Sequence, residues 1–141
     1  MNIYEVQPIF SHPTHPFDLT IDAPGSKSIT NRALMLAALA NGETLLKGAL
    51  FSDDSRHFLQ CLKDLGFDIV VNEPAHTVRV TGLGGRIPKE TAAINVGSAG
   101  TAARFLTAML GCAKGVWHLD ASEQMKKRPM SALLNTLTDL G

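Results

Sequence analysis

The sequence has little of what marks a membrane or nucleic-acid-binding protein. Its 13 basic and 13 acidic residues leave no net charge, so it lacks the basic excess typical of general binders of nucleic acid or anionic membranes. No apolar run approaches the ~18 residues that a membrane-spanning helix needs, and no basic-then-apolar signal pattern opens the chain. We therefore expect a cytoplasmic protein with no nucleic-acid or membrane partner, in which any anion site is local.

Cysteine, histidine and aromatic residues are also sparse. Cys61 and Cys112 are the only cysteines, and both lie in apolar, helix-like patterns, which predicts reduced core residues rather than a disulfide. His12 and His15 stand between prolines without a Cys or carboxylate at a ligand-like spacing, so we predict loop residues and no metal site. Trp117 has no aromatic neighbours, which favours a core or interface position over a base-stacking role.

What the sequence does have is an internal repeat. Two units, about 22–85 and 86–141, contain similar runs at the end of a predicted amphipathic helix, LKDLG at 62–66 and LTDLG at 137–141. Each is predicted to contain one almost wholly apolar helix and one amphipathic helix, at 29–40 and 53–65, then 99–112 and 129–140. The predicted strands are 43–50, 68–72, 77–81, 92–96 and 116–120. Because a helix that is apolar on all sides belongs in an interior, we expect a layered α/β fold with the apolar helices inside.

The turn at 24–28, PGSKS, leads directly into the first apolar helix and has the chemistry of an anion site. The backbone N–H groups of a first helical turn lack intrahelical partners and carry the positive end of the helix dipole. Lys27 adds a mobile charge there, and Ser28 adds a hydroxyl group. The ordinary alternative is a serine cap beside a solvated lysine.

Arg32 favours the anion site over that alternative. Its helical neighbours are apolar on nearly every face, and a buried unpaired guanidinium is very costly. A cleft that holds a phosphate or carboxylate would supply the missing partner.

The second unit has a comparable segment at 97–101, GSAGT, ahead of its apolar helix. Its glycines allow a close approach of the backbone, and Ser98 and Thr101 are candidate caps of the helix. As a repeat of the Lys27 turn, the segment predicts a second helix N-terminus that faces an anion. Taken alone, it is equally typical of a plain helix start.

A basic run, MKKRP at 125–129, is predicted to open the last helix, with Pro129 in its first turn. A guanidinium held there at Arg128 can bind a carboxylate or phosphate through two parallel hydrogen bonds, although most such runs are solvated turns. The acids in Ser52-Asp53-Asp54 precede a helix and are interpreted as a structural cap that matches the helix dipole.

Three runs together, PGSKSITNRALMLAALANG, GSAGTAAR at 97–104 and MKKRPM at 125–130, closely resemble the 5-enolpyruvylshikimate-3-phosphate synthase family, in that family's order. The resemblance covers essentially the whole chain. It implies repeated βαβαββ-type units, with apolar inner helices enclosed by sheets and amphipathic helices. It also implies transfer of the carboxyvinyl group of phosphoenolpyruvate to shikimate-3-phosphate, with release of phosphate and with no cofactor or metal.

The resemblance assigns substrate contacts residue by residue. The residues assigned to shikimate-3-phosphate are Lys27, Ser28 and Arg32. Those assigned to phosphoenolpyruvate are Lys27, Gly100 and Arg128, with Ser98 and Thr101 as possible further contacts. Lys27 is also the catalytic candidate, whereas Arg104 matches a family position without an assigned role.

A convincing carboxylate base is missing from this chain, and in the family that base comes from the C-terminal domain. We therefore expect 22–141 to be a partial N-terminal domain, with 1–21, including predicted strands at 3–9 and 17–21, belonging to the C-terminal domain. This polypeptide alone should be inactive and able to associate through exposed sheet edges, whereas the complete enzyme should be a monomer.

Two alternative functions stay open at this point. One is an anion-binding module without catalysis. The other is a UDP-N-acetylglucosamine enolpyruvyl transferase, which is disfavoured because Ser28 follows Lys27 where that family has Asn. Both cysteines also lie in helical patterns, whereas that family has a reactive cysteine in a flexible loop.

Overall fold

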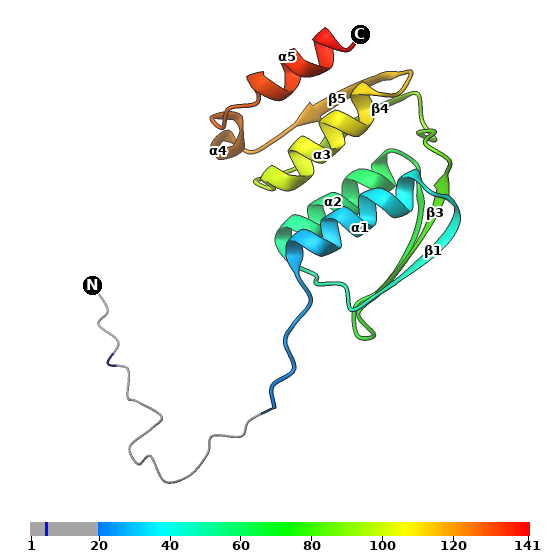
Figure 1. Cartoon of the computed structure of the whole chain (residues 1–141), viewed down its shortest axis with the longest axis vertical. Helices are drawn as coiled ribbons and strands as arrows, with labels where there is room; N and C mark the ends of the chain where they lie inside the picture. The colour runs from blue at the N-terminus through cyan, green and yellow to red at the C-terminus, as the bar shows by residue number, and fades with distance from the viewer. Residues whose placement is uncertain (1–4, 6–19) are drawn as a thin grey trace.

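The computed structural model describes residue 5 and residues 20–141 (Figure 1). Except for Glu5, the strand predicted at 3–9 lies outside the described residues, as do the first three residues of the strand predicted at 17–21. Thr20 and Ile21 are described and belong to no strand. No helix in the described part of the chain is long and apolar enough to cross a membrane.

The first unit contains two helices and a three-stranded antiparallel sheet. Its elements are α1 (Lys27–Leu39), β1 (Asn41–Lys47), α2 (Asp53–Asp64), β2 (Asp68–Asn72) and β3 (Thr77–Leu83). The strand order is β1-β3-β2, and α1 and α2 lie on one face of this sheet (Figure 1). These elements confirm the predicted ones in kind and order, although β1 ends at Lys47 rather than at 50 and β3 continues to Leu83 rather than ending at 81.

The second unit has a two-stranded parallel sheet. Its elements are β4 (Thr91–Asn95), α3 (Gly100–Gly111), β5 (Val116–Asp120), α4 (Glu123–Lys126) and α5 (Ser131–Asp139). β4 and β5 pair in parallel because α3 carries the chain back between them. Helix α3 contacts α1 and α2 as well as β5 and α5 (Figure 1). The short helix α4 was not predicted, because four residues show no helical period.

The two units meet at α2. Ser52 caps this helix and forms a reciprocal capping box with Ser55. The apolar face predicted for it is confirmed, since Phe58 and Leu62, like Cys61 and Leu65, are fully buried. Helix α2 contacts α1 and β2 in its own unit, and β4 and α3 in the next. Burial of each large apolar side chain stabilises the fold by ~1.5–3 kcal/mol, so this face of α2 supplies much of the hydrophobic stabilisation.

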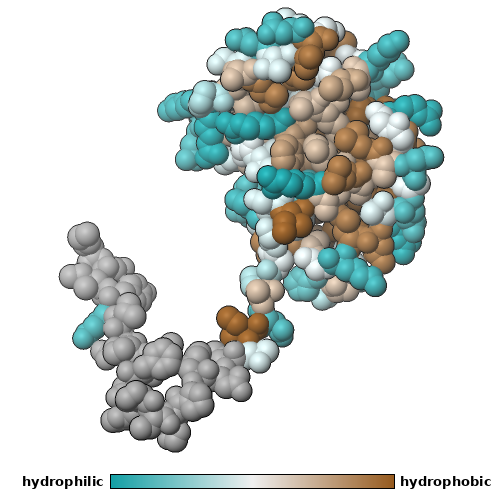
Figure 2. All heavy atoms as spheres, in the orientation of Figure 1, coloured by the Kyte–Doolittle hydropathy of each residue, from teal (hydrophilic) through white to brown (hydrophobic). Residues whose placement is uncertain are grey.

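Enclosure of the apolar helices is only partial among the described residues. Helix α1 leaves Ile29 68% and Leu36 62% exposed, and Figure 2 shows hydrophobic surface on the face that carries α1 and α3. No residue of α5 is buried, and its Leu134 is 49% exposed. Helix α5 makes its main contacts with α3, so most of its surface is not covered by the described residues.

The two cysteines have different environments, so the prediction that both lie in the core is wrong for Cys112. Cys112 follows the last turn of α3 and is exposed. Cys61 is buried, and its thiol donates a hydrogen bond to the carbonyl oxygen of Asn95 at 3.3 Å. Burial raises the pKa of the Cys61 thiol to about 12.

We expect iodoacetamide at pH 8 to label only Cys112 in the native protein and both cysteines after denaturation, because the thiolate is the reactive form. The raised pKa of Cys61 also means that the neutral thiol stabilises the fold. This stabilisation is fully present below the thiol pKa of the unfolded chain, about 8.5, and is lost as pH rises toward 12. Mass spectrometry of the labelled protein tests the first expectation. Equal native labelling of both thiols would show that Cys61 is accessible.

Close approach of β3 to the end of α1 requires glycine at position 82. A Cβ atom on Gly82 would collide with the backbone carbonyl oxygens of Ala37 and Ala40, which cannot move independently of α1. We expect Gly82→Ala to lower the free energy of unfolding by ~1–3 kcal/mol, measured by urea denaturation.

Gly111→Ala is the matched control for this substitution. The added Cβ there would meet only the end of the Leu137 side chain, 3.1 Å away, and alanine favours a helix. Equal midpoints of urea denaturation for Gly82→Ala, Gly111→Ala and the wild type would show that β3 does not need glycine at position 82.

Candidate functional site

A cationic cleft lies where the N-terminal turns of α1 and α3 face the segment between α4 and α5. It has a volume of about 340 Å³. Its lining residues are Lys27, Arg32, Asp54, Gly100, Thr101, Arg104, Phe105 and Arg128. Five candidates named from the sequence thus meet in one place, and the cleft has four basic side chains against one acidic one.

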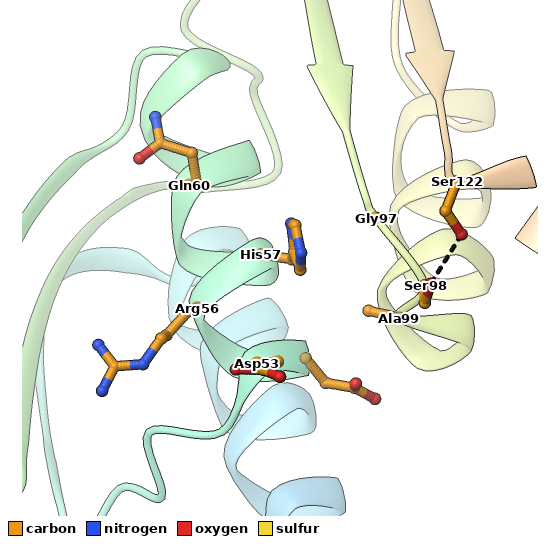
Figure 3. A pocket seen from close by; sticks show the side chains of 9 residues that line it. Asp53, Arg56, His57, Gln60, Gly97, Ser98, Ala99 and Ser122 are labelled. Carbon is orange, nitrogen blue, oxygen red and sulfur yellow. Dashed lines mark hydrogen bonds between the residues drawn. The ribbon is translucent and has the colours of Figure 1, made fainter.

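Two other sequence candidates, Ser28 and Ser98, do not line this cleft. Ser28 contributes its backbone, whose carbonyl oxygen accepts a hydrogen bond from Nη1 of Arg32 at 3.0 Å. Ser98 lies in a neighbouring cavity, where its hydroxyl is 2.7 Å from that of Ser122 (Figure 3).

Lys27 is held by an ion pair that the sequence did not reveal. Its Nζ lies 3.1 Å from Oδ2 of Asp54, in the first turn of α2. Asp54 also lies at the N-terminus of a helix capped by Ser52, so the structural role expected for it is present as well. An acid in a first helical turn is common, so no local signal could have identified Asp54 as part of the cleft.

Arg32 has partners within the protein. Besides its bond to Ser28, its guanidinium lies 5.5 Å from the centroid of the Phe105 ring, a cation–π arrangement. Arg32 is also exposed and lines the cleft, so its guanidinium does not depend on a bound anion for a partner. The partner comes from α3, which packs beside α1.

Gly100 allows two arginines to lie against the start of α3. A Cβ atom at this position would be 2.9 Å from Nη1 of Arg128 and 3.2 Å from Nη1 of Arg104. Arg104 donates hydrogen bonds to the carbonyl oxygens of Gly100 and Pro129, at 3.1 and 3.2 Å. Among the described residues, the Arg128 guanidinium has no hydrogen-bond or ion-pair partner.

The start of α3 has no side-chain cap, so the prediction that Ser98 and Thr101 cap it is wrong. Its N-cap residue is Ala99, and no side chain accepts from its first turn. The cause is the pairing of Ser98 with Ser122, which turns the Ser98 hydroxyl toward the N-cap of α4. By contrast, Ser26 caps α1. The N–H groups that open α3 are therefore available to an anion beside Arg128.

The basic run also differs from its prediction. Met125 and Lys126 belong to α4, and α5 begins only after its N-cap Met130, so Pro129 lies before the helix rather than in its first turn. Lys126 pairs with Asp120 at 3.1 Å. The pKa of Asp120 is lowered, first by a hydrogen bond from the backbone N–H of Ala121 and then by Lys126.

A second, larger cavity of about 690 Å³ adjoins the cleft at Asp54 (Figure 3). Its lining residues are Asp53, Asp54, Arg56, His57, Gln60, Gly97, Ser98, Ala99 and Ser122. Arg56 points out of it and binds Glu73, whose pKa this hydrogen bond lowers. Having two carboxylates and no unpaired arginine, this cavity is a poorer anion site than the smaller cleft.

Fold and cleft together define a class of protein: a repeated α/β domain with a cationic cleft between the helices of its two units. The model of the EPSP synthase (3-phosphoshikimate 1-carboxyvinyltransferase) family matches residues 12–141. The chain therefore belongs to the EPSP synthase family.

Individual relatives of the chain carry the name of this family. The chain is 48% identical over 126 residues to the 3-phosphoshikimate 1-carboxyvinyltransferase of Trichormus variabilis, covering 89% of this chain and 30% of that protein. It is 45% identical over 130 residues to that of Opitutus terrae, covering 91% and 30%. An EPSP synthase structure from Acinetobacter baumannii superposes with a TM-score of 0.76 at 30% identity, over 86% of this chain and 27% of that one. The chain thus spans about a third of its relatives' length.

We expect Gly100→Ala to weaken phosphate binding roughly tenfold, because the new methyl group displaces Arg128 and Arg104 from the start of α3. Unfolding free energy should stay within ~0.5 kcal/mol of the wild type, since only the ends of flexible side chains must move. Calorimetric titration with phosphate and urea denaturation measure the two effects. The matched control is Gly111→Ala at the other end of α3, which should leave phosphate binding unchanged.

Proposed function

We propose that this chain forms the anion-binding part of the substrate site of a 3-phosphoshikimate 1-carboxyvinyltransferase. The observation that carries the proposal is the meeting of four cations, Lys27, Arg32, Arg104 and Arg128, with an uncapped helix N-terminus in one cleft. Both substrates, shikimate-3-phosphate and phosphoenolpyruvate, carry a phosphate and a carboxylate. Binding two such polyanions side by side requires this density of positive charge.

The geometry favours a division of the cleft between the two substrates. Phosphoenolpyruvate is assigned to Arg128 and the backbone at Gly100, because that guanidinium is unpaired and lies over the open N–H groups of α3. The family resemblance assigns shikimate-3-phosphate to Arg32 and Ser28 on α1, of which Arg32 lines the cleft and Ser28 does not.

Lys27, the catalytic candidate, opens α1 and lies in the same cleft as Arg128. Its pairing with Asp54 holds the ammonium group in place before substrate arrives, and the phosphates compete for it afterwards. Thr101 lines the same cleft and is proposed as a further contact, whereas Ser98 lines the neighbouring cavity and pairs with Ser122.

Other expectations from the sequence belong to the same proposal. Residues 22–141 are a partial N-terminal domain, 1–21 pack with a C-terminal domain that supplies the base, and the complete enzyme works as a monomer in the cytoplasm. The anion-binding module without catalysis and the UDP-N-acetylglucosamine transferase are the alternatives to be separated by experiment.

Calorimetry with the chain should detect binding of shikimate-3-phosphate and phosphoenolpyruvate but not of UDP-N-acetylglucosamine. Lys27→Ala and Arg128→Ala should each weaken substrate binding by ~1.5–3 kcal/mol, because each removes a charge-assisted contact.

The control for these variants is Lys114→Ala, an exposed lysine between α3 and β5. Losses no greater than that of the control would contradict the proposed site. Binding of inorganic phosphate as tight as that of either substrate would favour the non-catalytic module instead.

A further inference from the structure

Arg104 joins the two parts of the cleft that bind anions. One of its guanidinium nitrogens donates to the Gly100 carbonyl in the first turn of α3, and the other donates to the carbonyl of Pro129. Pro129 follows Arg128 directly in the chain. Arg104 therefore ties the backbone beside Arg128 to the start of α3.

The segment that carries Arg128 has three other attachments: Met125 is buried, Met130 packs against the core, and Lys126 pairs with Asp120 on β5. Met125 is the one buried residue of α4, and α5 has none. Arg128 donates its backbone N–H to the carbonyl oxygen of Met125 within the same segment. A connection between Pro129 and α3 thus has a large share in setting where the Arg128 guanidinium lies.

The first unit contains a matching arrangement. Arg32, the repeat-equivalent of Arg104, donates to the carbonyl oxygen four residues before it, as Arg104 does. The rest of the Arg32 guanidinium packs on Phe105 of a neighbouring helix, whereas the rest of the Arg104 guanidinium binds Pro129. The Arg104 guanidinium donates two hydrogen bonds to the protein and that of Arg32 donates one, whereas that of Arg128 donates none among the described residues.

We propose that Arg104 is a positioning residue, which holds Arg128 over the open N-terminus of α3 and acts on the anion through it. The planar guanidinium can bond two carbonyl groups at once, which the compact ammonium group of lysine cannot do from the same position. The inference rests on the proposed function for the identity of the anion, but the contact itself exists without a ligand.

A double-mutant cycle with inorganic phosphate as the probe tests the coupling. Arg104→Gln and Arg104→Lys should each weaken phosphate binding roughly tenfold, although lysine keeps the charge. In an Arg128→Ala background, neither change should alter the affinity by more than about twofold. If the losses of phosphate affinity from the Arg104 and Arg128 substitutions multiply, or if Arg104→Lys binds phosphate as tightly as the wild type, then Arg104 contacts the anion itself. Either result would overturn the inference.

Failure of phosphate to bind would count against the proposed function alone. Hydrogen exchange without ligand then still tests the positioning role of Arg104. Arg104→Gln should speed exchange of the backbone amides of Lys127, Arg128, Met130 and Ser131 roughly tenfold, while leaving those of α2 unchanged. The control is Arg79→Gln on β3, where an exposed arginine pairs with Glu43. Unchanged exchange at 127–131 would overturn the positioning role, whatever the affinity for phosphate.

Discussion

Burial of the apolar face of α2 between the two units is the interaction on which the cleft depends. Phe58 and Leu62 pack into a core that continues into both units, and α2 contacts α1 on one side and α3 and β4 on the other. This packing fixes α1 and α3 beside each other, so that their N-termini face one cleft. It also brings Asp54, at the start of α2, to Lys27.

Concentrating positive charge in a protein of zero net charge requires local compensation. Three of the four cations in the cleft have a partner within the protein. Lys27 pairs with a carboxylate, Arg32 lies over an aromatic ring, and Arg104 bonds two backbone carbonyls. These contacts limit mutual repulsion and reduce the conformational entropy that a ligand must remove. Arg128 is left as the cation with its hydrogen-bonding capacity unused among the described residues.

The two repeated units share one arrangement of an arginine on the apolar helix, but α1 and α3 differ in how they begin. In both, an arginine one turn into an apolar helix bonds back to the carbonyl four residues earlier. The first helix is capped by Ser26, whereas the second has Ala99 at its N-cap and leaves its first N–H groups open. Duplication thus supplies two similar cationic helix ends, and the missing cap makes the second better suited to an anion.

The sequence by itself determined the four longer helices, the five described strands and the buried face of α2, because these follow from the local period of apolar residues. It did not predict the short helix α4 or the start of α5 after Met130. Its motifs also indicated Lys27, Arg32 and Arg128 as candidates. Only the tertiary structure decided that Asp54 pairs with Lys27, that Arg104 bonds Pro129 and that Cys112 is exposed. Each of these depends on which elements pack together, and residues far apart in the chain carry no local pattern that records their contact.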